Sequence, residues 1–83
     1  MTYKELFATL ILMGWINPNG NKELICSPES FKYNVGIMNA NEDGFVIFDP
    51  TKALTGKRGP AFPDWKDEYY TADEVMKIIS DNL

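Results

Sequence analysis

An α+β fold in one small domain, with the element order α-β-β-β-loop-α, is the class that this sequence predicts. Residues 2–14 and 72–83 carry apolar side chains at helical spacing, and a capping sequence stands at the start of each stretch. Short stretches rich in β-branched and aromatic residues lie between them. With 83 residues the chain has room for a single domain. We therefore expect a three-stranded antiparallel sheet with two helices packed on it.

The first predicted helix spans residues 2–14. Thr2 and Glu5 form a capping box, and Gly14 suits the left-handed residue that follows a helix. The broad apolar face consists of Tyr3, Leu6, Phe7, Leu10, Ile11 and Met13. Leu12 falls on the polar side of this helix. It is either a lone exposed leucine or the seam of a homodimer.

The second predicted helix spans residues 72–83. Thr71 and Glu74 form its capping box, and the acidic residues of the first turn lie at the positive end of the helix dipole. The narrow apolar stripe of this helix consists of Val75, Met76, Ile79 and Leu83. Such a stripe predicts a helix that packs on the sheet by one side only.

The three predicted strands cover residues 23–26, 31–38 and 45–48. The middle one is ambiguous over residues 28–36. Alternation favours a strand, with one face formed by Phe31, Tyr33, Val35 and Ile37. The other interpretation is a helix, since Ser27 is a good N-cap and Gly36 is a residue at which a helix commonly ends.

Residues 45–48 are the clearest strand in the sequence. Four apolar residues that favour strands stand between Gly44 and Pro50, so both faces of the segment are apolar. This pattern predicts the central strand of the sheet, or a strand that is covered on both faces. The polar residues 39–44 before it predict a turn that joins the last two strands.

Composition excludes several chemistries. The chain has no histidine and one cysteine, Cys26, so it has no Ser-His or Cys-His pair and no zinc site. Asn39, Asn41 and Asp43 have the spacing that opens an EF-hand calcium loop, but Pro50 stands where the bidentate glutamate belongs. We expect no catalytic residues, no metal and no cofactor.

The charge distribution and the hydropathy bear on partners and location. The net charge of −4 argues against nucleic acid as the main partner. The apolar run at residues 6–16 is too short to cross a bilayer, which takes about 20 residues, and no secretory cleavage signal follows it. A single cysteine fits a reducing compartment. The sequence therefore predicts a cytoplasmic protein without a membrane segment.

The irregular loop at residues 50–70 is the candidate working surface. Its first part, residues 52–58, carries three positive charges and no negative one. Its second part mixes aromatic and acidic side chains, and Trp, Tyr and Arg dominate binding hot spots. The predicted partner-binding residues are Lys57, Arg58, Trp65, Asp67, Glu68, Tyr69 and Tyr70.

The function predicted from these features is that of a small protein-binding module without catalysis. Its size and mild acidity are typical of the proteins by which a phage or mobile element inhibits a host protein. One alternative is a nucleic-acid-binding accessory protein that uses the basic loop 52–58. Another is a structural homo-oligomer closed through Leu12. The acids that follow residue 63 are interpreted as a solvated helix face, with mimicry of a nucleic-acid backbone as the less favoured alternative.

Overall fold

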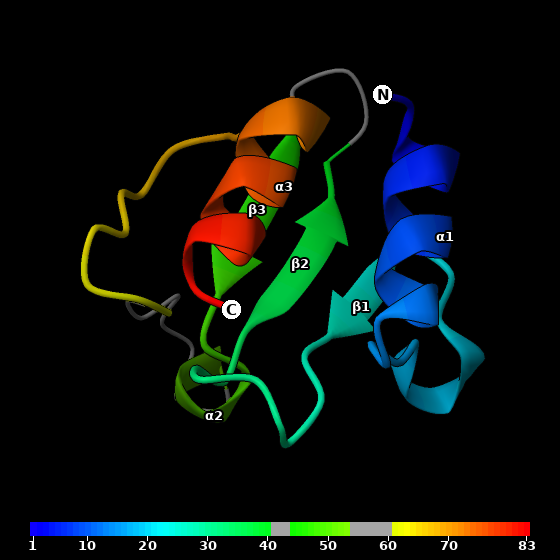
Figure 1. Ribbon diagram of the computed structural model, residues 1–83, viewed down its shortest axis with the longest axis horizontal. Helices are drawn as coiled ribbons and strands as arrows, with labels where there is room; N and C mark the ends of the chain where they lie inside the picture. The colour runs from blue at the N-terminus through cyan, green and yellow to red at the C-terminus, as the bar shows by residue number, and fades with distance from the viewer. Residues whose placement is uncertain (41–43, 54–60) are drawn as a thin grey trace.

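The protein is described here by a computed structural model that covers residues 1–40, 44–53 and 61–83 (Figure 1). Its regular elements are the helices α1 (Tyr3–Leu12), η1 (Pro18–Gly20), α2 (Pro50–Ala53) and α3 (Ala72–Asp81) and the strands β1 (Leu24–Cys26), β2 (Gly36–Asn39) and β3 (Phe45–Phe48). The strands form one antiparallel sheet in the order β1-β2-β3. The predicted α+β fold is confirmed. Among the described residues, no helix is long and apolar enough to cross a membrane.

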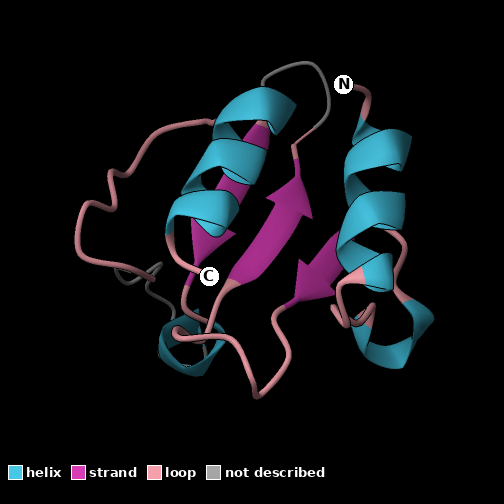
Figure 2. Ribbon diagram, in the orientation of Figure 1, coloured by secondary structure: helices cyan, strands magenta, loops and turns pink. Residues whose placement is uncertain are grey.

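The core lies between the sheet and the two long helices, which both stand on the same face of the sheet (Figure 2). Ile25, Ile37 and Ile47 are paired across the three strands and are buried. Alternation along the strands turns these side chains to one face, where they meet the helices. The helix residues in the same cluster include Leu6, Phe7, Leu10, Val75 and Ile79.

Local signals in the sequence define both long helices. The Thr2 hydroxyl accepts a hydrogen bond from the backbone N–H of Glu5, as the capping sequence predicts. Helix α1 ends at Leu12, and Gly14 follows with a φ of +95°, which glycine adopts without strain. Helix α3 ends at Asp81, two residues before the predicted end. Of the residues predicted for the apolar faces, Ile11 and Leu83 are exposed.

The capping box of α3 leads to a prediction about acid stability. The backbone N–H of Thr71 donates to the carboxylate of Glu74 at 2.9 Å, and this bond lowers the pKa of Glu74 below its usual 4.5. A carboxyl group with a lowered folded-state pKa stabilises the fold above its unfolded pKa, and this stability is lost as the pH falls through the folded value. We therefore expect Glu74→Gln to be less stable than the unmodified protein near pH 7, and the difference to shrink as the pH falls through the folded pKa of Glu74.

Chemical denaturation at a series of pH values measures this effect. Glu29→Gln, which removes one carboxylate at an exposed position outside the helices, is the matched control. A constant gap between Glu74→Gln and the unmodified protein from pH 7 down to about pH 3 would contradict the assignment.

The predicted strand 31–38 is shorter in the structure, where β2 begins only at Gly36. Residues 27–35 form a loop that is neither strand nor helix, and hydrogen bonds of Ser27 join its two ends. The Ser27 hydroxyl accepts from the N–H of Val35 at 2.9 Å and donates to the carbonyl of Tyr33 at 3.0 Å. These bonds give the backbone polar groups a local partner in place of a strand ladder. Phe31 consequently packs on Trp15, with ring centroids 5.3 Å apart.

Strand β3 does not occupy the predicted central position. It pairs only with β2 in the sheet, so β2 is central and β3 lies at the edge. The burial of β3 agrees with the other predicted alternative, a strand that is covered on both faces. Phe45 and Ile47 face the helices, whereas Phe48 is buried on the opposite face, outside the main core cluster. Among the described residues of the loop predicted at 50–70, the first four form the short helix α2.

Candidate functional site

The face of the sheet turned away from α1 and α3 is the most distinctive surface of the described chain. We call it the outer face. Its strand residues are Leu24, Cys26, Gly36, Met38, Val46 and Phe48. None of these side chains is charged, although charged residues make up 24% of the chain. No helix of the described chain covers this face in the way that α1 and α3 cover the other one (Figure 2).

Phe48 fills the hollow that Gly36 leaves on the outer face. The two residues are paired between β2 and β3, and a Cβ atom built on Gly36 would lie 2.7 Å from the tip of the Phe48 ring. The ring can lie flat on the neighbouring strand only because residue 36 has no side chain. Phe48 is buried as a result, while Met38, two residues along β2 from Gly36, is 43% exposed.

The free edge of β1 is occupied by residues that precede the strand. Ile16 and Cys26 exchange two backbone hydrogen bonds of 3.0 and 2.8 Å. The side-chain amide of Asn17 donates to the carbonyl of Leu24 at 2.7 Å. Because paired residues direct their side chains to the same face, Ile16 extends the outer face beyond β1, and it is 62% exposed.

The free edge of β3 is occupied by the irregular segment before α3. Tyr70 and Phe45 exchange backbone hydrogen bonds of 2.8 and 2.9 Å. The indole N–H of Trp65 donates to the carbonyl of Ile47 at 2.7 Å. A peptide that adds a strand to a sheet needs unpaired edge groups. Since most outward groups of β1 and β3 already have partners, a binding partner would meet this sheet through its outer face.

Tyr69 lies at the border of the outer face. Its neighbour Tyr70 shares the helix-facing side with Phe45, so alternation turns Tyr69 the other way. The Cβ atom of Tyr69 is 3.6 Å from the position that a Cβ atom on Gly44 would take. Tyr69 is 54% exposed. The accessible part of the face, which we call the outer apolar surface, consists of the exposed residues Ile16, Met38 and Tyr69 and the half-buried residues Leu24 and Val46.

The structure separates the residues that the sequence predicts as partner-binding. Tyr70 is only 6% exposed, and its hydroxyl bonds with the backbone of Lys66 at both N–H and carbonyl, so it belongs to the core and not to a binding surface. Trp65 is partly buried against β3. No helical turn joins Trp65 to Tyr69. The exposed members are Asp67, Glu68 and Tyr69.

Three other predicted positions have different outcomes. Lys57 and Arg58 lie outside the described residues, so the basic loop stays a prediction. Leu12 is 89% exposed at the end of α1. Its proposed role in a homodimer also stays a prediction, because exposure alone does not identify a partner.

The sequence prediction included only Tyr69 of the outer apolar surface and missed its other four members, Ile16, Leu24, Met38 and Val46. Residue 16 falls outside every predicted strand, and its position follows from its bridge to Cys26. Met38 could have been found, because alternation from Ile37 places it on the opposite face. The predicted strand 31–38 placed Met38 on that face together with the polar residues Lys32 and Asn34, so the face was not recognised as apolar.

The outer face has no group suited to nucleophilic chemistry. Burial raises the pKa of the Cys26 thiol above its usual 9.0. A reactive cysteine needs a lowered pKa, so this one behaves as a small apolar residue. Within the described parts of the chain, no three acidic or cysteine side chains come together in a way that could hold a metal ion.

Comparisons with protein-family models, with curated proteins and with solved structures find no match to this chain.

Proposed function

We propose that the protein is a binding module without catalysis that docks on another protein through its outer apolar surface. The observation that supports this proposal is an uncharged sheet face with exposed large side chains at Ile16, Met38 and Tyr69. Contiguous apolar surface of this kind is characteristic of interaction sites in small proteins. The flexible side chain of Met38 lies at the middle of the face, and methionine adapts to the shape of a partner.

The charges beside the surface indicate what kind of partner would fit. Asp67 and Glu68 are exposed and lie next to Tyr69 in the chain. Complementarity favours a partner that has an apolar patch flanked by lysine or arginine, because opposite charges at the rim increase the association rate. The predicted role as a phage or mobile-element inhibitor would follow if such a patch belonged to the working surface of a host protein.

The area of the surface favours a different protein over a second copy. The strands and the two flanking bridges are spaced at about 4.8 Å and are about 13 Å long, so the face covers roughly 300 Å². A stable interface needs about 800 Å² from each partner. A dimer formed by this face alone would fall short of that value. A larger partner can add contacts beyond the sheet, over the acidic residues beside Tyr69.

Substitution at the centre of the surface tests the proposal. We expect Met38→Asp to reduce recovery of bound partners from a host lysate at least tenfold, because binding would desolvate an unpaired carboxylate. Tyr69→Ala should have an effect in the same direction. Leu12→Asp is the matched control, since it adds the same charge at an exposed apolar residue on the other side of the fold.

Quantitative mass spectrometry of the captured proteins measures the recovery, and thermal unfolding checks that each variant folds. Equal capture by Met38→Asp and by the unmodified protein would refute the outer surface as the docking site. Loss of capture with Leu12→Asp alone would point to the end of α1 in its place.

A further inference from the structure

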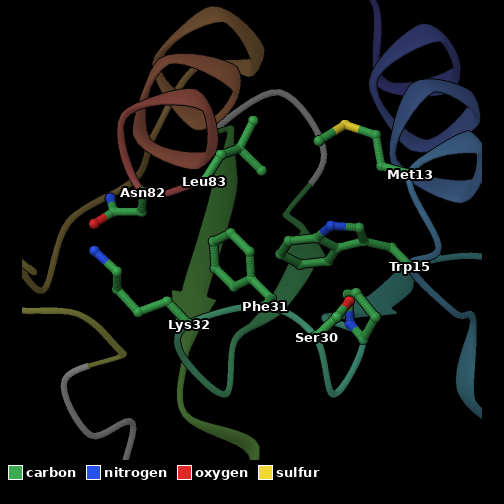
Figure 3. A pocket seen from close by; sticks show the side chains of 8 residues that line it. Met13, Trp15, Ser30, Phe31, Lys32, Asn82 and Leu83 are labelled. Carbon is green, nitrogen blue, oxygen red and sulfur yellow. The ribbon is translucent and has the colours of Figure 1, made fainter.

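A cavity of about 200 Å³ opens between the C-terminal ends of the two long helices and the loop at residues 27–35 (Figure 3). It lies on the helix side of the sheet, away from the outer apolar surface. Its lining residues are Met13, Trp15, Pro28, Ser30, Phe31, Lys32, Asn82 and Leu83. The walls are largely apolar, and a few polar groups stand among them, which is the usual composition of a small-molecule site.

Trp15 contributes a hydrogen-bond donor to the wall of the cavity. The residue is 97% buried, since only 3% of its surface is exposed. Within the described chain, no group accepts from its indole N–H, whereas the indole of Trp65 donates to β3. Figure 3 shows the indole nitrogen of Trp15 on the side of the ring that faces Met13 and Leu83. No buried side-chain nitrogen or oxygen of the described chain lacks a hydrogen-bond partner, so this N–H is reached by solvent and can donate to a ligand in the cavity.

Lys32 contributes a positive charge without a carboxylate partner in the described chain. Its ammonium group lies 5.7 Å from the centre of the Tyr33 ring, and Figure 3 shows it extended toward Asn82. The Ser30 hydroxyl adds a further donor, whereas the side-chain N–H of Asn82 is already bound to the carbonyl of Ile78. The polar side chains therefore offer donors at Lys32 and Ser30, and the amide oxygen of Asn82 is an acceptor that Figure 3 shows beside the Lys32 nitrogen.

The C-terminal ends of α1 and α3 offset only part of the positive charge of Lys32. Neither α1 nor α3 has a basic residue in its last turn, so their C-terminal carbonyls leave a partial negative charge near the cavity. That partial charge amounts to about half a unit at each end and falls off within a turn. Lys32 carries a full unit charge and a direct donor, which favours an anionic group at its end of the cavity.

We propose that this cavity binds a small organic carboxylate with an apolar body. The carboxylate would face Lys32, and the body would lie against Phe31, which Figure 3 places between Lys32 and Trp15. The volume of about 200 Å³ corresponds to roughly seven groups of the size of water. Hexanoate and benzoate are of this size. The proposal is independent of the outer apolar surface, so either can fail alone.

Nuclear magnetic resonance titration tests the proposal on the intact chain. The chain has two tryptophans, and Trp65→Phe assigns the two indole N–H signals. We expect hexanoate to shift the Trp15 indole signal saturably, with a dissociation constant of about a millimolar, as is typical for so small a ligand. Hexanamide has the same size without the charge and should bind at least tenfold more weakly.

Two variants separate charge recognition from a general effect. Lys32→Ala should weaken hexanoate binding about tenfold, whereas Lys66→Ala, at an exposed lysine outside the cavity, should leave it unchanged. The proposal is wrong if the Trp15 signal does not move up to about 20 mM hexanoate. It is equally wrong if hexanamide produces the same shift, or if Lys32→Ala binds hexanoate as well as the unmodified protein does.

Discussion

Gly44→Ala should lower the free energy of unfolding by about 3 kcal/mol, which is a large share of the stability of a small domain. Gly44 has a φ of +111°, a conformation that an alanine adopts only with strain. A Cβ atom at this position would also lie 2.7 Å from the carbonyl oxygen of Tyr70. That oxygen accepts the bond from Phe45 that holds residue 70 against β3, so it cannot move without loss of the bridge.

Gly20→Ala provides the matched control. Gly20 also has a positive φ, of +71°, but a Cβ atom there would meet nothing within 4 Å. This variant therefore carries the conformational cost alone, about 1 kcal/mol. Denaturant unfolding with fluorescence detection measures both. Equal losses for the two variants would show that the close approach of Tyr70 to Gly44 contributes nothing to stability.

Ile37→Ala should cost about 3 kcal/mol, within the range of roughly 2–5 kcal/mol for a buried aliphatic residue. Ile37 lies in the central strand with no exposed surface, between Ile25 and Ile47 and beneath the helices. Truncation leaves a cavity that packed neighbours on three sides cannot fill.

Met38→Ala is the adjacent comparison and should cost less than about 1 kcal/mol, because Met38 faces outward and is half exposed. The pair tests which face of the sheet belongs to the core. Thermal and denaturant unfolding of both variants give the two values. A larger loss for Met38→Ala than for Ile37→Ala would mean that the outer face is covered in the folded protein.

Local sequence signals predicted the helices well, and the fold class with them. The capping sequences at Thr2 and Thr71 act over three residues, so their effect can be derived without knowledge of the fold. The loop at residues 27–35 could not be derived in this way. Alternation there is real, but a hydroxyl eight residues from Val35 competes for the backbone.

The candidate site was predicted only in part, because its members are brought together by contacts between distant residues. The sequence pointed to Tyr69 and Tyr70 as a pair. The bridge between Tyr70 and Phe45 decides which of the two is buried, and it joins residues 25 positions apart. The bridge from Ile16 to Cys26 similarly brings residue 16 to the outer face.

The segment that lies along β3 also determines how this protein would misassemble. An exposed strand edge is the template on which further chains add during fibril growth. Here Trp65 and Tyr70 occupy that position in each molecule, so growth at the β3 edge requires residues 61–70 to detach first. The rate of aggregation should therefore follow the local opening of this segment, which can occur without global unfolding.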